Sequence, residues 1–462
     1  MNRRRFLRNT ALSGSGLLIL RNSASAGTYQ ANEKVNVALI GVSGRGSWFV
    51  RAIPEVGQNV VALCDANERR AAEAFAKFPQ ARKYRDFRKM LDEMGKQIDA
   101  VTVATPDNTH AIISMTAMKA GKHVLCEKPL THDVAEARAL RDALAKYSVA
   151  TQMGNQGTAS PGFRRAVAII QQGLLGEVRE VHAWNTGGGS GERPLPKGSQ
   201  PIPDYLDWDV WLGPAAERPF HEEWLKWHGW RDFATGNLGN WASHTNNLAF
   251  KALKIDSLWK ADASGDLSKR QIRVQAEVSG IHKNTFPKWE TVHWQIPARG
   301  DLPPVQLNWY NSGGDAMEKN GIRGQIEKLL GRRMDWTTED GNEWRDWAGI
   351  LLVGQKGLLY SNAHNTEFTL LPAEKFKDFK GPEESLPRSR GHEREWIDAC
   401  KGGPAAMSNF TYSGPLTELN MLGNVATQIE GAIEYDPATM KITNNAVADG
   451  LLRREYRKGW AL

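Results

Sequence analysis

The sequence has few cysteines, no long hydrophobic run and no recognisable metal-binding cluster. Its three cysteines, Cys64, Cys126 and Cys400, are too few for a disulfide framework, and none has the C-x-x-C spacing of a zinc site. No H-E-x-x-H or comparable cluster is present, so we predict no metal. Hydrophobic residues make up 41% and charged residues 24%, an ordinary globular composition that excludes a multispan membrane protein and a long disordered chain. The length of 462 residues predicts two or three domains.

The first 26 residues have the pattern of an export signal. Five of the seven net positive charges lie there, on Arg3, Arg4, Arg5, Arg8 and Arg21. Removing them leaves a net charge of +2, which gives no electrostatic argument for nucleic-acid binding. The apolar stretch 11–20 is too short for a membrane span, and Ala24-Ser25-Ala26 has a small-x-small cleavage pattern. We therefore predict that residues 1–26 are a twin-arginine signal peptide and that the mature protein is periplasmic or otherwise extracytoplasmic. A disordered basic tail is the alternative.

Residues 33–155 have the pattern of a Rossmann domain, with a doubly wound parallel sheet that binds a dinucleotide. Apolar strands are expected at 35–40, 59–64, 100–104 and 123–126, with helical sequence between them. Gly41-Val-Ser-Gly-Arg-Gly46 follows the first strand and matches the G-x-G-x-x-G fingerprint except for Ser43 at the middle glycine. Asp65 ends the second strand, at the spacing of an acid that binds the ribose 2′-hydroxyl, and so favours NAD. Arg69 nearby leaves NADP possible.

A dinucleotide is expected beyond the carboxyl ends of these strands. Lys128 follows one of them and is placed to orient or deprotonate a substrate hydroxyl, with a surface lysine paired to Glu127 as the alternative. The predicted cofactor-binding residues are Gly41, Ser43, Gly44, Arg45, Gly46, Asp65, Thr105, Pro106, Asn108, His110, Glu127 and Lys128.

Residues 156–462 predict a substrate-binding α+β domain with a large, mainly antiparallel sheet. Alternating segments indicate its strands, at 177–184, 271–278, 291–296, 305–310, 350–353, 357–360 and 367–371. Later helices are expected at 393–400 and 416–430. The Gly/Pro-rich stretch Gly187–Pro203 is a candidate mobile loop over the site.

One polar helix, at 236–250, carries Asn240, His244 and Asn247 at spacings of four and three residues, which places them on one helical face. With the Gly-x-x-Gly-Arg-Gly turn, the Asp after the second strand, Ala-Thr-Pro and Glu-Lys-Pro, the chain resembles the glucose-fructose oxidoreductase / inositol dehydrogenase (Gfo/Idh/MocA) family. Segments such as 206–213, 408–410 and 453–460 resemble its exported, sugar-associated branch.

The resemblance implies a catalytic histidine at His244, within the family pattern Asp-x-x-x-His-x-x-Asp. Both family acids are Asn here, at 240 and 247, and an amide cannot accept a hydroxyl proton. We therefore expect Lys128 and His244 to carry acid–base chemistry, with Asn240 tuning it. A helix histidine satisfied by packing is the alternative for His244.

The resemblance implies a sugar or polyol as the substrate. Six tryptophans lie between positions 208 and 241, and flat aromatic rings suit the faces of pyranoses. Trp230, His228 and Asn247 are the predicted substrate contacts, and a packed aromatic cluster is the alternative. We predict an NAD(P)-dependent oxidoreductase that holds its cofactor tightly and transfers a hydride between the nicotinamide and a secondary hydroxyl. We also expect the protein to be a homo-oligomer. A redox-neutral NAD-dependent glycoside hydrolase or lyase acting through a transient 3-keto sugar, or a catalytically silent sugar-binding protein, remains open.

Overall fold

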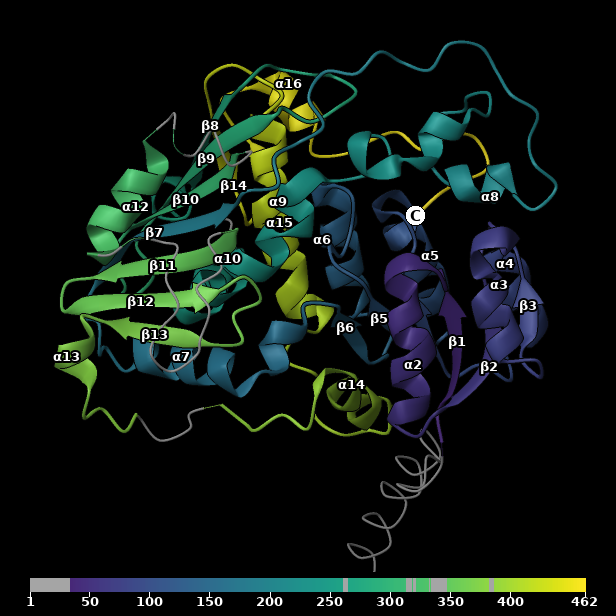
Figure 1. The fold of residues 1–462 in the computed structure, drawn as a ribbon, viewed down its shortest axis with the longest axis horizontal. Coiled ribbons are helices and arrows are strands. Elements are labelled where there is room, and N and C mark those ends of the chain that lie inside the picture. Colours follow the sequence, from purple (N-terminus) through teal and green to yellow (C-terminus); the bar gives the residue numbers. More distant parts are fainter. Residues whose placement is uncertain are drawn as a thin grey trace, which may run out of the picture.

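The N-terminal domain of the computed structural model is a parallel α/β layer structure (Figure 1). The model describes residues 34–260, 265–312, 318, 321–331, 333, 347–381 and 386–462. The first sheet has six strands in the order β3-β2-β1-β4-β5-β6, all parallel. The strands are β1 (Asn36–Ile40), β2 (Asn59–Cys64), β3 (Arg82–Tyr84), β4 (Ala100–Val103), β5 (His123–Cys126) and β6 (Thr151–Met153). Their helices are α2 (Ser47–Glu55), α3 (Glu68–Lys77), α4 (Phe87–Met94), α5 (Asp107–Lys119) and α6 (Val134–Ala143). The predicted Rossmann sheet is confirmed.

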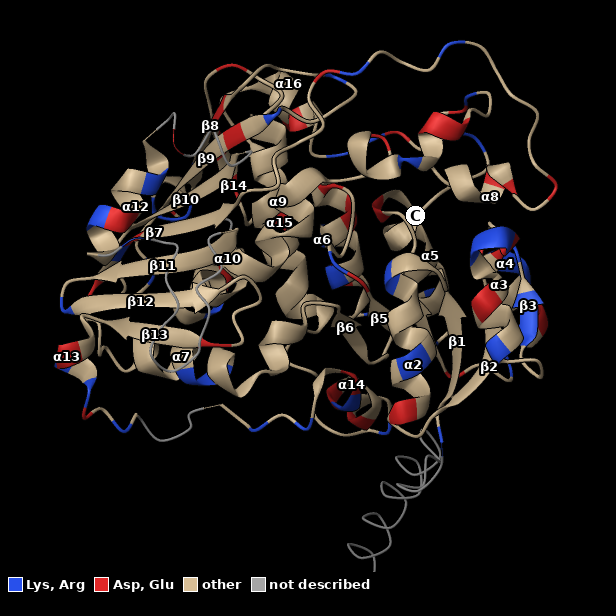
Figure 2. Cartoon of the chain, in the orientation of Figure 1, with Lys and Arg blue, Asp and Glu red and all other residues tan. Residues whose placement is uncertain are grey.

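The strands are apolar on both faces because helices cover both sides of a parallel sheet. All four residues of β4 are buried, as are the last three of β5. Short polar side chains begin the helices: Asn67 accepts from the backbone N–H of Arg70, and Asp133 from that of Glu136, which satisfies donors that a helix start leaves unpaired. Figure 2 shows many of the charged residues on helices and loops, whereas the central strands β1, β4 and β5 carry none.

The C-terminal domain is built on a nine-stranded mixed sheet in the order β13-β12-β11-β7-β10-β9-β8-β14-β15. Its strands are β7 (Val178–Asn185), β8 (Ile272–Val278), β9 (Trp289–Ile296), β10 (Val305–Ser312), β11 (Ala348–Gly354), β12 (Gly357–Asn362), β13 (Phe368–Leu371), β14 (Ala432–Asp436) and β15 (Lys441–Ile442). Neighbouring strands are antiparallel except β7 and β10, which pair in parallel. The predicted α+β domain with a mainly antiparallel sheet is confirmed.

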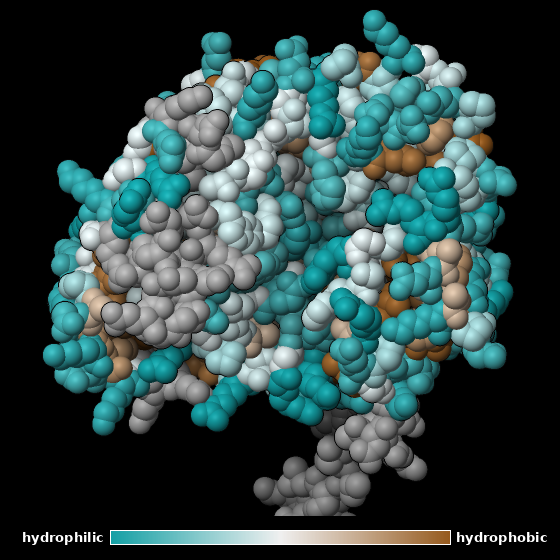
Figure 3. Space-filling view, in the orientation of Figure 1, coloured by the Kyte–Doolittle hydropathy of each residue, from teal (hydrophilic) through white to brown (hydrophobic). Residues whose placement is uncertain are grey.

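Helices cover the sheet and connect it to the first domain. They are α7 (Pro161–Gln171), α8 (Trp208–Leu212), α9 (Gly236–Asn240), α10 (Ala242–Ala252), α12 (Ile322–Leu330), α13 (Ala373–Phe376), α14 (His392–Cys400), α15 (Phe410–Ala426) and α16 (Ala446–Gly450). Within the described ranges, no helix combines the length and hydropathy that crossing a membrane requires. Figure 3 shows a mainly hydrophilic face with small separate apolar patches.

The two domains share one hydrophobic core, which runs from the helices of the first sheet to the inner face of the second. Helix α15 lies at its centre and is buried at nearly every position. Its Glu418 is fully buried and pairs with Arg138 of α6 at 2.8 Å, while also accepting from Trp259 and Tyr435. Because both charges of this buried ion pair have their partners, the pair holds α6 of the first domain and α15 in one relative position. The residues between the two domains are thereby held in place as well.

The expected helix at 236–250 is two helices, which is a correction to the sequence prediction. Helix α9 ends at Asn240, Trp241 joins it to α10, and α10 starts at Ala242. Gly236 has a φ of 61° at the start, and Gly239 lies so close to Thr235 that a Cβ there would meet its Oγ1 at 1.9 Å. These glycines allow close packing but weaken the first turns, so the helix is interrupted. The later predicted helix at 416–430 is instead α15, six residues earlier at its start.

Candidate active site

A cavity of about 470 Å³ opens between the two domains at the carboxyl ends of the parallel strands. The first domain contributes Gly41, Ser43, Gly44, Arg45, Asp65, Arg70, Arg85, Thr105, Pro106, Asp107, His110, Glu127 and Lys128 to its lining. The second contributes Gly188, Gly189, Ser190, Val210, Trp211, Trp227, His228, Gly236, Asn237, Asn240 and Phe286. The crevice beyond the strand ends is where doubly wound sheets bind ligands.

The turn between β1 and α2 requires glycine at two positions. Gly41 has a φ of 76°, and a Cβ there would lie 2.5 Å from the carbonyl oxygen of Ala104. A Cβ at Gly46 would lie 1.9 Å from the Gly41 carbonyl oxygen, so the helix can approach the strand only without a side chain. Ser43, the departure from the fingerprint, lies in extended backbone, which a side chain tolerates. The substitution therefore leaves the turn intact.

Asp65 lies across this turn and organises it. Its carboxylate accepts from the backbone N–H groups of Val42 at 3.1 Å and Asn67 at 3.0 Å. Burial raises the pKa of Asp65, while these hydrogen bonds and the charge of Arg70 oppose the rise. Arg69, which the sequence suggested as a phosphate contact, lies instead over the ring of Tyr205 at 4.2 Å. The next residue, Arg70, lines the cavity, and sequence spacing alone did not distinguish the two.

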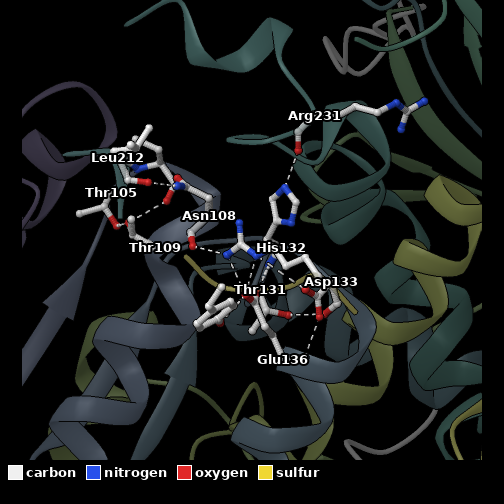
Figure 4. A network of polar contacts seen from close by, with 12 residues as sticks. Thr105, Asn108, Thr109, Thr131, His132, Asp133, Glu136, Leu212 and Arg231 are labelled. Atoms are coloured by element: carbon white, nitrogen blue, oxygen red, sulfur yellow. Dashed lines mark hydrogen bonds and ion pairs between the residues drawn. The ribbon is translucent and has the colours of Figure 1, made fainter. Parts of the chain in front are cut away.

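Asp107 and Thr109, which follow β4, line the cavity but are absent from the predicted cofactor-binding residues. Asp107 accepts from the backbone N–H of Thr235 at 3.0 Å and from its hydroxyl at 2.6 Å. Thr105 and Pro106 also line the cavity. Asn108 does not: it is fully buried and donates to the carbonyl of Leu212 at 3.0 Å (Figure 4). Its side chain joins the domains rather than facing the cavity.

His110 borders the cavity from behind this turn. Its Nδ1 lies 2.7 Å from the carbonyl oxygen of Pro129 and its Nε2 lies 2.9 Å from that of Thr105. Burial opposes a charge on the ring, but Cys126, Asp107 and the Pro129 carbonyl favour it and raise the pKa of His110 to about 10. A ring with both nitrogens protonated satisfies both carbonyls, so His110 ties the Thr105 turn to the loop that carries Lys128.

Lys128 and Asn240 meet across the cavity. The ammonium of Lys128 donates to the amide oxygen of Asn240, which brings the ends of β5 and α9 together. Burial lowers the pKa of Lys128, and Glu127 and Asp107 oppose that fall. Glu127 is buried and pairs with Arg45 at 2.7 Å. Lys128 and Asn240, which the sequence placed in one site without predicting a contact, do lie together. The alternative, an ion pair between Lys128 and Glu127, does not form, because Glu127 pairs with Arg45.

His244, on α10, is not one of the described residues that line the cavity. It is 4% exposed, and its Nδ1 has no hydrogen-bond partner in the described part of the chain. Burial, with the positive charge of Lys128 next, lowers the pKa of His244 well below the usual value, so the ring is neutral. Its ring centroid lies 4.6 Å from that of His364, on the β12–β13 turn.

Two of the three predicted substrate contacts are packed inside the protein. Asn247 donates to Thr158 at 2.9 Å and accepts from the Tyr412 hydroxyl at 2.6 Å, so its amide is fully engaged. Trp230 is 2% exposed and donates to the carbonyl of Glu223 at 3.0 Å. Neither residue lines the cavity.

The third contact, His228, does line the cavity. It stacks on Trp227 with ring centroids 3.6 Å apart. Trp211 and Phe286, which the prediction did not single out, add further aromatic surface. Gly188, Gly189 and Ser190, at the start of the predicted loop Gly187–Pro203, line the cavity as well, and that loop contains no helix or strand.

Two family models match the chain. The Gfo/Idh/MocA model for the oxidoreductase family's NAD-binding Rossmann fold matches residues 35–155, and the model for its C-terminal alpha/beta domain matches residues 171–292. Levoglucosan dehydrogenase of Pseudarthrobacter phenanthrenivorans is 30% identical over 159 residues, 32% of this chain and 39% of that protein. Inositol 2-dehydrogenase 2 of Saccharopolyspora erythraea is 30% identical over 158 residues, 34% of this chain and 46% of that protein. The matched region thus spans less than half of either curated relative.

Solved structures share the fold across most of the chain. Levoglucosan dehydrogenase in complex with NADH and levoglucosan has a TM-score of 0.56 at 17% identity, and the match covers 88% of this chain and 100% of that one. The WlbA dehydrogenase from Bordetella pertussis, in complex with NADH and UDP-GlcNAcA, has a TM-score of 0.56 at 16% identity, with 87% and 98% covered. The fold, the glycine turn and the two family models agree, and the chain belongs to the Gfo/Idh/MocA family of oxidoreductases, with its NAD-binding Rossmann domain.

Proposed function

We propose that the protein is an NAD-dependent oxidoreductase that removes a hydride from a secondary hydroxyl of a sugar or polyol. One observation carries this proposal: the glycine turn with Asp65 and the Lys128–Asn240 contact line the same cavity. The first set of groups suits an adenosine diphosphate, and the second suits a reacting hydroxyl. Curated relatives named for levoglucosan and inositol support a polyhydroxylated substrate.

The cavity fits an extended dinucleotide. Asp65 follows β2 and Lys128 follows β5, and the sheet order places β1 and β4 between them. Three spacings of about 4.8 Å put these strand ends roughly 14 Å apart, a span that suits a cofactor lying across the sheet edge. The glycines at 41 and 46 allow the turn to pack tightly against Ala104 and against itself. The backbone of Gly41, Ser43 and Gly44 then borders the cavity where a pyrophosphate would bind. Asp65 would hold the ribose hydroxyls, and Lys128 would lie at the nicotinamide end.

Bound NAD supplies the hydride acceptor, and the chain positions the carbinol carbon and handles the proton. Lys128 has a lowered pKa, so its neutral amine is accessible and can take the hydroxyl proton at Nζ. Asn240 orients that amine by accepting from it. His244 is neutral and does not line the cavity, so we assign it a role in supporting Lys128, whose charge acts on it, rather than direct contact with the hydroxyl.

The other walls suit a neutral, polyhydroxylated ring. Trp227 and His228 form a flat stacked surface, and Trp211 adds a second one. Asn237 donates to Gly188 and Asn311 and keeps its carbonyl oxygen as an acceptor near the cavity. Aromatic faces against C–H groups and amides against hydroxyls are the usual combination for sugar binding, so this pattern supports the substrate class.

We further propose that NAD is held tightly, because a segment of the second domain closes over the Asp65 end of the cavity. Leu206 forms a β-bridge with Asn67, and the Tyr205 carbonyl accepts from Glu68 at 2.9 Å. The end of α8 is then fastened by the C-terminal Arg457, which donates to the Gly213 carbonyl at 2.6 Å. Dissociation of a cofactor beneath Val210 and Trp211 requires this segment to open.

Export by the twin-arginine route belongs to the same proposal. The signal, residues 1–26, lies outside the described residues. The route transports folded proteins, which suits an enzyme that must acquire NAD in the cytoplasm and then keep it. The Arg3–Arg4 pair and the small-x-small site before Gly27 support the assignment.

Mass spectrometry of the purified protein for bound NAD or NADP, followed by a panel of sugars and polyols monitored at the NADH absorbance, tests the function. We expect bound NAD and absorbance that rises with at least one secondary alcohol. Glycoside cleavage with no NADH accumulation would instead support the redox-neutral alternative. A protein that binds sugars and retains no nicotinamide would refute both.

A further inference from the structure

The ammonium of Lys128 lies against a neutral group. It donates to Asn240, whose amide oxygen offers a dipole but no charge. Lys128 is partly buried, and burial lowers its pKa because a charged amine loses hydration there. A lysine that must become an ammonium when it accepts a proton needs a carboxylate nearby, and Asn240 cannot provide one.

Two carboxylates act on Lys128, namely Glu127 and Asp107. Glu127 is already committed. Its Oε1 accepts from Arg45 at 2.7 Å and Gln156 at 3.5 Å, and its Oε2 accepts from the backbone N–H of Lys128 at 3.2 Å. The guanidinium of Arg45 balances its charge, and Arg45 itself disfavours a cation on Lys128. Glu127 therefore holds the loop in place and favours the ammonium of Lys128, while Arg45 offsets part of that effect.

Asp107 differs from Glu127 because Thr235, and not an arginine, holds its carboxylate. It is the first residue of α5, where the helix dipole favours a negative charge, and it lines the cavity. Thr235 fixes its Oδ2 with two hydrogen bonds, at 3.0 Å from the backbone and 2.6 Å from the hydroxyl. No group in the described residues donates to its Oδ1. In the described residues no arginine or lysine forms an ion pair with Asp107. The other titratable groups whose charged form it favours are His110, His132 and His228.

Thr235 also precedes α9, the helix that ends in Asn240. Its carbonyl accepts from Asn424 of α15, which anchors this junction to the shared core. The same residue thus positions the Asp107 carboxylate from the first domain and the start of the helix that holds Asn240. Thr235 therefore links the placement of the Asp107 carboxylate to that of Asn240, which contacts Lys128.

We propose that Asp107 is a positioning residue that supplies a second counter-charge for Lys128, beside that of Glu127, from the start of α5. The inference rests on the proposed function, in which the Lys128 amine takes the hydroxyl proton. In that step the O–H bond breaks and an N–H bond forms on Lys128, while the C–H bond breaks with its electron pair going to bound NAD and a carbonyl remains. Asp107 stabilises the ammonium that results, and Asn240 directs it.

Competitive acetylation of Lys128 against pH, read by mass spectrometry, measures the pKa of Lys128 without any substrate. The variants are Asp107→Asn, Asn240→Asp and both together, with exposed Asp92→Asn on α4 as a matched control. Asp107→Asn keeps the acceptor for Thr235 but loses the charge. We expect it to shift the labelling midpoint down by about one pH unit, Asn240→Asp to shift it up by at least as much, and the double variant to return it toward wild type.

The kinetic readout separates charge from structure. In Asp107→Asn, the limb of the pH profile of kcat/KM that reports the titration of Lys128 should shift by the same amount as the labelling midpoint. The value of kcat should fall about tenfold or more, and NAD should stay bound. Restoration of kcat in the double variant would support a requirement for charge at either position. A labelling midpoint unchanged in Asp107→Asn, with its melting temperature preserved, would overturn the proposal. Labelling that shifts as expected in a protein that oxidises no sugar would refute the proposed function but not the pairing.

Discussion

Replacing Asp65 with Ser tests how the site chooses its cofactor. The carboxylate accepts from the backbone N–H groups of Val42 at 3.1 Å and Asn67 at 3.0 Å, and it faces the cavity beside Arg70. With two oxygens it can accept further hydrogen bonds from ribose hydroxyls. A 2′-phosphate would meet a like charge at the same place. Asp65→Ser should therefore weaken NAD and strengthen NADP.

The magnitude follows from these groups. A hydrogen bond to a charged acceptor contributes about 1.5–3 kcal/mol, so NAD should bind roughly 10–150-fold more weakly. Repulsion at about 5 Å, with an effective dielectric constant of about 20, amounts to about 3 kcal/mol for each unit of phosphate charge. Together these terms should shift the NADP-to-NAD ratio of Kd values by roughly a hundredfold or more. Arg70 should contribute to the gain, because it is the guanidinium that lines the cavity.

Titration of cofactor-free protein with NAD and with NADP, by calorimetry or fluorescence, measures this ratio. The double variant Asp65→Ser/Arg70→Ala should lose much of the gain in NADP affinity. Asp65→Ser/Arg69→Ala is the matched control and should keep it, because Arg69 lies over Tyr205 outside the cavity. A wild type that already binds NADP more tightly than NAD would refute this role of Asp65.

The remaining predictions concern catalysis, retention and export. Lys128→Ala should slow turnover by roughly 10²–10⁴-fold, and His244→Ala should slow it by a smaller factor, while NAD stays bound in both variants. Full turnover in both variants would place the chemistry elsewhere. Burial lowers the pKa of His244 well below the usual value of about 6.5, so the ring stays neutral at that pH. A pH–rate profile should therefore show no loss of activity near pH 6.5 that comes from protonation of His244. Arg457→Ala should speed NAD release about tenfold or more, because it loses the 2.6 Å hydrogen bond to the Gly213 carbonyl. An unchanged release rate in a chase experiment would show that the segment from Tyr205 to Gly213 does not retain the cofactor. Exchange of Arg3 and Arg4 for lysine should leave the precursor in the cytoplasm, and continued export through the unfolded-chain route would contradict the signal assignment.

The sequence was most informative where local pattern and fold coincide. Apolar runs bounded by turn residues predicted both sheets, because buried parallel strands and half-exposed antiparallel strands have different periodicities. Gly41 and Gly46 were identifiable because only glycine fits their backbone positions. Lys128 was placed correctly at a strand end, since strand ends gather at one edge of a parallel sheet.

The residues whose predicted roles differ from the structure are those whose positions are set by packing between segments that lie far apart in the sequence. Asn108 and Trp230 have side chains that suit a ligand, but Leu212 and Glu223 take their hydrogen bonds. Nothing in the local sequence records which partner a polar group will find across the domain junction. Asp107 was passed over for the same reason, because its value as a site residue comes from Thr235, more than a hundred residues away.

Because the helix is interrupted at Trp241, the three polar residues that were expected on one helical face do not all face the cavity. A continuous helix would align Asn240, His244 and Asn247, whereas the interruption leaves Asn240 at the cavity and Asn247 against Tyr412. Gly236 and Gly239 were visible in the sequence as weak helix formers. Their effect could not be weighed without the close contact that Gly239 makes with Thr235.

Deuterium transfer tests the central claim most directly. The NAD-loaded protein is incubated with the active sugar carrying deuterium at each carbinol carbon in turn, and the nicotinamide is then extracted and analysed by mass spectrometry. The account predicts one deuterium at C4 of the nicotinamide from a single sugar position in wild type, and at least a hundredfold slower labelling in Lys128→Ala. Consumption of the sugar with an unlabelled nicotinamide would contradict it.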